Sequence, residues 1–223
     1  GGPHISRAMD QRGLVPQFIE GLRVTDEATM SVVQATLAGE INPDIVRLVN
    51  GNGSVATGVS GLDANLFVAR PRDEQLGYVG DVAKVNPGII QSLQDRGYVP
   101  VVAPLARGED GHPYNLNADT AAAALAVALG AAKLVYLTDV EGLYRDPADE
   151  ESLISRISTA DLSGLLGSDS VSAGMVPKLR SCIDAIEGGV DRAHILDGRV
   201  EHALLLEIFT PEGIGTMIAK EGG

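Results

Sequence analysis

Several short segments combine side chains and backbone groups that could bind an anion and stabilise charge on a group being transferred. In Gly174-Met175-Val176-Pro177-Lys178, the proline marks the first turn of a predicted helix. Lys178 therefore lies near a helix N-terminus, where the helix dipole disfavours a cation. The placement becomes favourable once a phosphate binds there, because the lysine and the helix end would both hold it. A solvated surface lysine is the simpler alternative.

Two segments near the start of the chain could hold anionic groups of a small molecule. Gly1-Gly2-Pro3 leads into a predicted helix and can direct backbone N–H groups at an anion, although a flexible terminus is the simpler explanation. Arg23 stands just before a second predicted helix, which Thr25 or Asp26 would cap. Its planar guanidinium suits bidentate binding of a carboxylate, whereas a surface ion pair is the commoner role.

Polar residues also gather at the start of an alanine-rich predicted helix, 118–129. Asn115 and Asn117 share one side of the extended approach, and Asn117 or Asp119 can cap the helix. Three polar residues at a helix start that follows a strand end are typical of ligand sites in open α/β sheets, so site and cap are equally good explanations. The loop Thr138-Asp139-Val140-Glu141-Gly142-Leu143-Tyr144 follows a buried-type strand, where ligand-contacting loops are common.

Composition narrows the classes of partner. The 223 residues carry 17 Lys and Arg against 30 Asp and Glu, a net charge of −13, without a basic cluster. This balance argues against nucleic acid and does not favour an anionic membrane surface. No apolar run approaches the roughly 18 residues of a membrane span. The single cysteine, Cys182, predicts a cytoplasmic location, and no Cys and His cluster has the spacing of a metal site.

Alternating helical and strand-like segments predict an α/β fold with a mostly parallel sheet. The predicted helices cover 3–11, 26–37, 87–95, 118–129, 159–166, 176–187 and 202–209. A further helix is predicted to begin after Asn42, which would cap it. The predicted strands cover 54–62, 66–69, 75–79, 99–103, 134–137, 193–196 and 216–219. The chain is expected to form one compact unit whose two functional halves meet between residues 102 and 119.

In their order along the chain, these segments resemble the amino-acid kinase family. The residues that carry the resemblance are Gly1-Gly2-Pro3, Gly21-Leu22-Arg23-Val24-Thr25, Asn115-Leu116-Asn117-Ala118-Asp119, Thr138 to Tyr144 and Ala173-Gly174-Met175-Val176-Pro177-Lys178. The resemblance implies a three-layer αβα sandwich around a mostly parallel sheet. The Leu-Arg-Val-Thr and Leu-Asn-Ala-Asp segments point to the members that phosphorylate the side-chain carboxylate of N-acetyl-L-glutamate in arginine biosynthesis. ATP is the implied co-substrate, and Mg²⁺ is expected with it.

The resemblance also implies roles for residues that bind the acyl-amino acid. Gly1 and Gly2 would offer backbone N–H groups to the substrate carboxylate and the transferring phosphoryl group. Arg23 and Asn115 would hold the α-carboxylate, with Asn117 nearby. Residues 1–117 would form the lobe that binds this substrate and makes a dimer contact.

Residues 118–223 would form the lobe that binds ATP. Lys178 would stabilise charge on the transferring phosphoryl group, and Asp119 would orient that lysine. A base is not required, because a carboxylate nucleophile has no proton to lose. Thr138, Asp139 and Tyr144 would border the nucleotide.

The C-terminal stretch resembles the arginine-inhibited branch of the family. His194, Glu207 and Gly213 match positions of its effector site, in which Glu207 would pair with L-arginine. An ordinary strand residue is the alternative for His194. That branch is hexameric through an extra N-terminal helix, which we expect this chain to lack, and a dimer is expected to persist.

The family pattern also begins earlier than this sequence does. Its first strand carries a Lys-x-Gly-Gly motif, and its second glycine motif reads His-Gly-Gly-Gly-Pro, within which this sequence starts. We therefore expect the first strand and an N-terminal catalytic lysine to be missing, and this chain alone to turn over little or no substrate. The alternatives are a non-catalytic module that binds arginine or nucleotide, and a related carboxylate or carbamate kinase.

Overall fold

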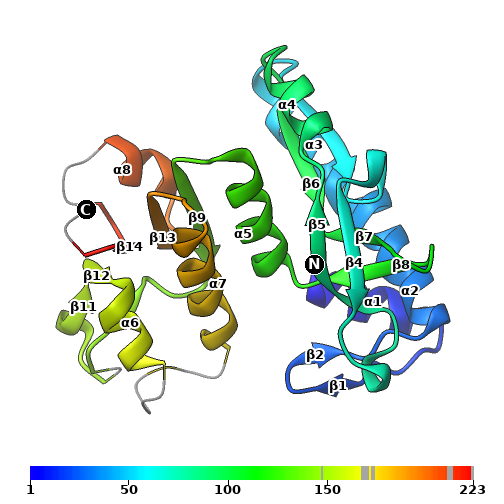
Figure 1. The fold of residues 1–223 in the computed structure, drawn as a ribbon, viewed down its shortest axis with the longest axis horizontal. Helices are drawn as coiled ribbons and strands as arrows, with labels where there is room; N and C mark the ends of the chain where they lie inside the picture. The colour runs from blue at the N-terminus through cyan, green and yellow to red at the C-terminus, as the bar shows by residue number, and fades with distance from the viewer. Residues whose placement is uncertain (147, 167–170, 172–173, 210–212, 222–223) are drawn as a thin grey trace. The chain divides into compact units, whose positions relative to one another are not determined.

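A computed structural model describes residues 1–146, 148–166, 171, 174–209 and 213–221 (Figure 1). The chain divides into two compact units, Gly1–Ala121 and Ala122–Gly223. The division lies four residues after the lobe boundary that the sequence predicts, inside a helix. Mixed helices and strands build both units, so the predicted α/β class is confirmed.

Helices α1 (Gly2–Asp10) and α2 (Glu27–Gln34) pack together in the first unit. Their apolar faces meet in a cluster that includes Ile5, Met9 and Val33. Burial of a side chain of this size contributes about 1.5–3 kcal/mol to folding. The Asp26 carboxylate accepts a hydrogen bond from the Thr29 N–H at 2.7 Å and caps α2, as the sequence predicts for one of its two candidates.

The helical run that begins with α2 continues without a break to residue 49. A π-helical segment, η1 (Ala35–Ile41), joins α2 to α3 (Asn42–Val49). The prediction that Asn42 caps a new helix is therefore wrong. Its side-chain amide instead donates to the carbonyl oxygens of Val59 (3.3 Å) and Val101 (2.7 Å). Gly58 leaves the room for this contact, since a Cβ there would lie 2.2 Å from Asn42 Oδ1.

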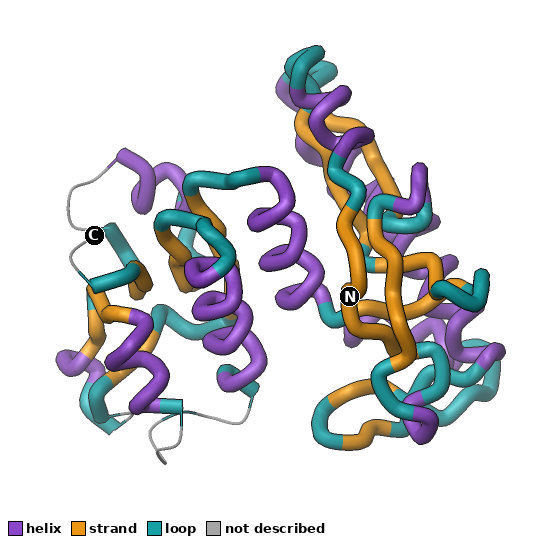
Figure 2. Tube along the Cα trace, viewed as in Figure 1, coloured by secondary structure: helices purple, strands orange, loops and turns teal. Residues whose placement is uncertain are grey.

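The strands of the first unit form three groups. Figure 2 draws all strands in orange. β1 (Phe18–Ile19) and β2 (Leu22–Arg23) make a hairpin, and β3 (Ala56–Ser60) pairs in parallel with β6 (Val99–Ala103). A closed four-stranded barrel contains β4 (Phe67–Pro71), β5 (Val79–Val85), β8 (Pro113–Leu116) and β7 (Leu105–Gly108). The remaining elements are α4 (Gly88–Gln94) and the 3₁₀ turns η2 (Asn50–Asn52), η3 (Asp63–Asn65) and η4 (Glu74–Leu76).

The barrel differs from the sequence prediction in two ways. The predicted strand 75–79 is wrong for most of its length, because η4 occupies residues 74–76 and β5 begins at Val79. The hairpin of β7 and β8 was not predicted at all. Each of its strands has only four residues, which is too short for an alternating pattern to stand out.

The second unit contains a four-stranded sheet in the order β12 (Arg156–Ser158), β14 (Thr216–Ala219), β13 (Arg192–Asp197) and β9 (Lys133–Thr138). Two of its three strand pairs are parallel, and β13 with β14 is antiparallel. A hairpin of β10 (Leu143–Tyr144) and β11 (Leu153–Ile154) carries η5 (Glu150–Ser152) in its loop.

Helices cover both faces of this sheet. Ala193 and Ile195 point into a core shared with α5 (Ala118–Leu129), α6 (Thr159–Leu165) and α7 (Val176–Glu187). His194 alternates to the other face, where it meets α8 (Ala203–Phe209). Within the described ranges, no helix is both long and apolar enough to cross a membrane.

Candidate functional site

Arg23, at the end of β2, is a buried cation held by neutral groups. The whole residue is 8% exposed to solvent. Nη2 donates to the carbonyl oxygen of Gly2 at 3.1 Å and to Ser6 Oγ at 2.8 Å, and Nη1 donates to Met9 Sδ at 3.2 Å. The guanidinium carbon also lies 4.7 Å from the centroid of the Phe18 ring. Sequence reasoning missed Ser6, Met9 and Phe18. The spacing of Gly2, Ser6 and Met9 places these three residues on one face of α1, which could have indicated Ser6 and Met9.

The surroundings of Arg23 leave its charge without a protein counter-ion. No carboxylate of the described residues lies within ion-pair distance of the guanidinium. Burial lowers the pKa of Arg23, because water is removed from the charged group. A buried charge is costly unless an opposite charge joins it, so this position favours an anionic ligand.

The start of α1 lies beside this arginine. Gly1 is the N-cap residue, and no side chain caps the helix. A Cβ on Gly1 would lie 3.2 Å from Leu37 Cδ2, whereas Gly2 has open space around it. Because Gly2 contacts Arg23 directly, the structure brings two of the predicted substrate-binding residues together.

Backbone pairing connects this region to Asn115 on β8. Thr25 forms an isolated bridge with Gly77, and its carbonyl oxygen accepts from the Tyr78 N–H at 2.7 Å. The Tyr78 carbonyl oxygen then accepts from the Asn115 N–H at 2.9 Å. The Asn115 side chain makes no hydrogen bond with other described residues and remains available to a ligand.

Asn117 has a structural task at the start of α5. Its Oδ1 accepts hydrogen bonds from the N–H groups of Asp119 (3.0 Å) and Thr120 (3.1 Å). The capping explanation therefore holds for Asn117, and its predicted place near the substrate stays a prediction. Asp119 lies in the first turn of the same helix. Its predicted action on Lys178 involves residues of different units and also stays a prediction.

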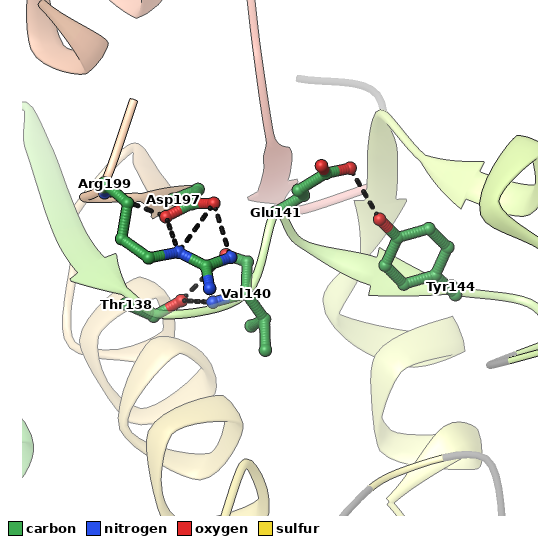
Figure 3. A network of polar contacts seen from close by, with 6 residues as sticks. All are labelled: Thr138, Val140, Glu141, Tyr144, Asp197 and Arg199. Atoms are coloured by element: carbon green, nitrogen blue, oxygen red, sulfur yellow. Dashed lines mark hydrogen bonds and ion pairs between the residues drawn. The ribbon is translucent and has the colours of Figure 1, made fainter. Parts of the chain in front are cut away.

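In the second unit, the predicted nucleotide loop follows β9 (Figure 3). Thr138 Oγ1 donates to the Val140 carbonyl at 2.9 Å and accepts from the Val140 N–H at 3.0 Å, which fixes the turn. Asp139 is exposed, and the Tyr144 hydroxyl donates to Glu141 Oε2 at 2.7 Å. These hydrogen bonds of Thr138 and Tyr144 thus fix the conformation of the loop.

An ion pair that the sequence did not predict lies at the end of the neighbouring strand, β13. Arg199 binds Asp197 through two nitrogens, Nε to Oδ1 at 2.9 Å and Nη2 to Oδ2 at 2.8 Å (Figure 3). The hydrogen bonds from Arg199 lower the pKa of Asp197 and those to Asp197 raise the pKa of Arg199. Asp197 pairs with Thr138, so this cation and the loop lie at the carboxyl ends of two parallel strands, where open α/β sheets bind ligands.

Lys178 lies in the first turn of α7, as its sequence position predicts. The N-cap residue, Met175, has helical backbone angles, and no side chain caps the helix. The ammonium nitrogen of Lys178 lies 5.1 Å from the centroid of the buried Tyr136 ring on β9. A cation over an aromatic face at this distance gains electrostatic stabilisation.

The three predicted effector residues come together around one carboxylate. His194 is 2% exposed, and its Nδ1 lies 2.5 Å from Glu207 Oε1. Glu207 Oε2 accepts from the Ile214 N–H at 3.0 Å. Gly213 has a φ of +66°, and a Cβ there would lie 2.7 Å from Glu207 Oε2, so both the backbone angle and the space favour glycine.

Three further observations concern His194 and possible metal ligands. Burial lowers the pKa of His194, while the hydrogen bond with Glu207 acts in the opposite direction. Its Nε2 is buried and has no hydrogen-bond partner among the residues that the structure describes. Within the same residues, no three His, Cys, Asp or Glu side chains group together as a metal site.

Comparison with known proteins places the chain in a family. Residues 1–197 match the amino-acid kinase family model. Acetylglutamate kinase from Heliobacterium modesticaldum is 50% identical over 232 aligned positions, which cover 99% of this chain and 79% of that protein. N-acetylglutamate synthase from Neisseria gonorrhoeae, solved with coenzyme A and N-acetyl-glutamate, superposes with a TM-score of 0.84 at 33% identity. That match covers this whole chain and 51% of the synthase. The same synthase solved with coenzyme A and L-arginine gives a TM-score of 0.83 at 32% identity, over 99% of this chain and 53% of the synthase.

The chain therefore belongs to the amino-acid kinase family, as its motif order predicts. Within that family, its sequence is similar to acetylglutamate kinases, which confirms the members to which the Leu-Arg-Val-Thr and Leu-Asn-Ala-Asp segments point.

Proposed function

We propose that the protein is a kinase that uses ATP to phosphorylate the side-chain carboxylate of N-acetyl-L-glutamate, giving N-acetyl-L-glutamyl 5-phosphate for arginine biosynthesis. Its acetylglutamate kinase relatives support this reaction. In the structure, the supporting observation is Arg23, a buried cation whose hydrogen-bond partners among the described residues are all neutral. Such a cation suits the α-carboxylate of an acyl-amino acid.

The proposed reaction needs positioning and positive charge more than acid–base chemistry. An oxygen of the substrate side-chain carboxylate attacks the γ-phosphorus of ATP, a new P–O bond forms, and the bond to the bridging oxygen of ADP breaks. Gly1 and Gly2 would bind near the transferring group, and Asn115 would join Arg23 on the substrate, with Asn117 nearby. Lys178 would stabilise the charge that develops on the phosphoryl oxygens, with Asp119 orienting it.

The proposal assigns the acyl-amino acid to residues 1–117 and ATP to residues 118–223. Thr138, Asp139 and Tyr144 would border the nucleotide, and the Asp197–Arg199 ion pair lies at the same strand ends. Mg²⁺ would be held mainly by ATP phosphates and water, as such sites often are. The three-layer αβα arrangement, a cytoplasmic location and a homo-oligomer, dimeric or hexameric, belong to the same proposal.

Trapping of the acyl phosphate tests the reaction. The protein, as its natural gene encodes it, is incubated with MgATP, N-acetyl-L-glutamate and hydroxylamine, and the hydroxamate is measured. We expect hydroxamate only when both ATP and N-acetyl-L-glutamate are present. Its absence would contradict the proposal, and product from another carboxylate or from carbamate instead would identify a related kinase.

Replacement of Arg23 tests its role separately from turnover. Arg23→Lys keeps the charge but loses the planar fork, so we expect the Kd for N-acetyl-L-glutamate to rise about 10- to 100-fold. Isothermal titration calorimetry measures this change. Arg47→Lys is the matched control, because Arg47 is exposed and pairs only with Asp44. An unchanged Kd in Arg23→Lys would remove Arg23 from the substrate site.

We also propose that L-arginine binds at His194, Glu207 and Gly213 and inhibits the enzyme. The support is the single carboxylate around which these residues gather, together with the related synthase that was solved with L-arginine. Glu207→Gln should abolish inhibition by L-arginine while turnover without arginine persists. Retained inhibition would place the effector elsewhere.

A non-catalytic binding module is the second candidate, because this chain also superposes on 51% of N-acetylglutamate synthase from Neisseria gonorrhoeae, so the fold also occurs as one part of a protein with another name. That alternative predicts calorimetric binding of L-arginine or nucleotide with no acyl phosphate formed by the natural gene product.

A further inference from the structure

The guanidinium of Arg23 is held on several sides, and every group that holds it is neutral. Gly2, Ser6 and Met9 approach from one face of α1, with the closest contact at Ser6 Oγ, 2.8 Å from Nη2. The Phe18 ring of β1 lies against the guanidinium as well. Ser6 itself is partly buried, and Met9 is 1% exposed.

Neutral acceptors and a carboxylate would act differently at this position. Each would fix the orientation of the arginine, because the fork of N–H groups accepts only a few geometries. A carboxylate of the protein would also neutralise the positive charge of the arginine. A hydroxyl, a carbonyl and a thioether leave most of that charge for a ligand, in surroundings where electrostatic attraction is strong.

We propose that Ser6 is a positioning residue, which holds Arg23 in place without neutralising it and so preserves its affinity for the carboxylate of N-acetyl-L-glutamate. The inference rests on the proposed function. It adds that the uncharged character of the Ser6 side chain, and not only its size, is required. Because Gly2 contacts the same guanidinium, α1 links the arginine to the glycine segment at its own N-terminus.

A matched pair of variants separates charge from shape. Ser6→Asn and Ser6→Asp introduce side chains of nearly equal size that both offer an acceptor oxygen, but only aspartate carries a negative charge. We expect Ser6→Asn to weaken binding of N-acetyl-L-glutamate by about 3- to 10-fold. Ser6→Asp should weaken it by on the order of 100-fold, because the new carboxylate occupies the arginine. Calorimetry on the natural gene product gives both Kd values.

A second readout excludes a merely structural role for Ser6. The urea midpoint of Ser6→Asp should equal or exceed that of Ser6→Asn, since the aspartate pairs with a buried cation. Affinity and stability would then change in opposite directions. Ser92→Ala is the control, because the Ser92 hydroxyl donates to a carbonyl of its own exposed helix turn at 2.8 Å. It should change neither quantity.

The outcomes distinguish this inference from the function on which it rests. Equal Kd values for the Asn and Asp variants would overturn the role of Ser6 while the kinase proposal stands. Wild-type protein that fails to bind N-acetyl-L-glutamate would overturn both. If the Asp variant does not fold, Ser6→Ala and Ser6→Thr decide the matter. Threonine restores the hydroxyl, so it should recover the affinity that alanine loses, and equal loss in both would contradict the proposal.

Discussion

Arg23 and Lys178 are cations with different surroundings, and the difference predicts different kinetic roles. Neutral hydrogen-bond acceptors hold Arg23, for which we propose the substrate carboxylate as ligand. Lys178 lies in the first turn of α7 over the face of Tyr136. A binding cation stabilises substrate and transition state alike, whereas a cation near the transferring group acts mainly on the transition state.

Replacing Lys178 with alanine should therefore lower kcat and leave the KM for N-acetyl-L-glutamate nearly unchanged. We expect a loss of about 100- to 1,000-fold in kcat, the range found when one group that stabilises developing charge is removed. Steady-state kinetics of the natural gene product measure both constants. Lys84→Ala, at an exposed position of β5, is the control. A kcat equal to that of wild type would exclude Lys178 from the chemical step.

His194 should make stability depend on pH on the acid side of neutrality. Burial lowers its pKa below 6.5, although Glu207 partly offsets that effect, and Lys133 and Arg192 add to the lowering. The unfolded chain then binds more protons than the folded one as the pH falls through 6.5. The free energy of unfolding should decrease in this window and recover as the pH rises.

Urea unfolding at several values between about pH 7.5 and pH 5 measures this effect. His194→Gln removes the titrating group, so its free energy of unfolding should change less over the window than that of wild type. The exposed His202→Gln variant should retain the wild-type dependence. The aspartates whose pKa values are lowered, among them Asp26 and Asp197, titrate below 3.8 and act at lower pH. An identical pH profile in His194→Gln would contradict the prediction.

Among the elements, those with strong local signals were predictable from the sequence. The helices α5 and α7 begin and end where the sequence predicts, because alanine content, Pro177 and the following glycines act locally. The π-helical segment and the β7–β8 hairpin were not predictable in this way. Asn42 binds carbonyl groups 17 and 59 residues away, and no local pattern reports such a contact.

Asn115, on β8, and Asn117, at the start of α5, provide a test at the level of these two elements. Asn117→Ala removes the cap of α5 and should lower the free energy of unfolding by about 1 kcal/mol. Asn115→Ala removes a side chain that bonds to no described residue, so stability should stay within about 0.5 kcal/mol of wild type while N-acetyl-L-glutamate binds more weakly. Urea unfolding and calorimetry separate the two effects. Equal stability losses would contradict these assignments.

At the scale of the whole molecule, each unit contains its own cluster of candidate residues. Gly1, Gly2, Arg23 and Asn115 belong to the first unit, and Thr138, Lys178, His194 and Glu207 to the second. The motifs also fall into two blocks along the sequence, and the ligand that each of the lobes 1–117 and 118–223 binds stays a prediction. Roles that need residues of both units, such as the action of Asp119 on Lys178, depend on more than either unit alone and stay predictions.

Hydrogen exchange tests whether ligands act on the units in this way. A ligand at 100 times its Kd adds about 2.7 kcal/mol to the stability of the region that binds it, so amides that exchange by opening that region should slow about 100-fold. N-acetyl-L-glutamate should protect α1 and the β1–β2 hairpin, MgATP the residues from Thr138 to Tyr144 and the start of α7, and L-arginine the segment from β13 to α8. Mass spectrometry of peptides reports each region. Protection of the second unit alone by N-acetyl-L-glutamate would contradict the assignment of the substrate to Arg23, because a ligand slows exchange first where it makes its contacts.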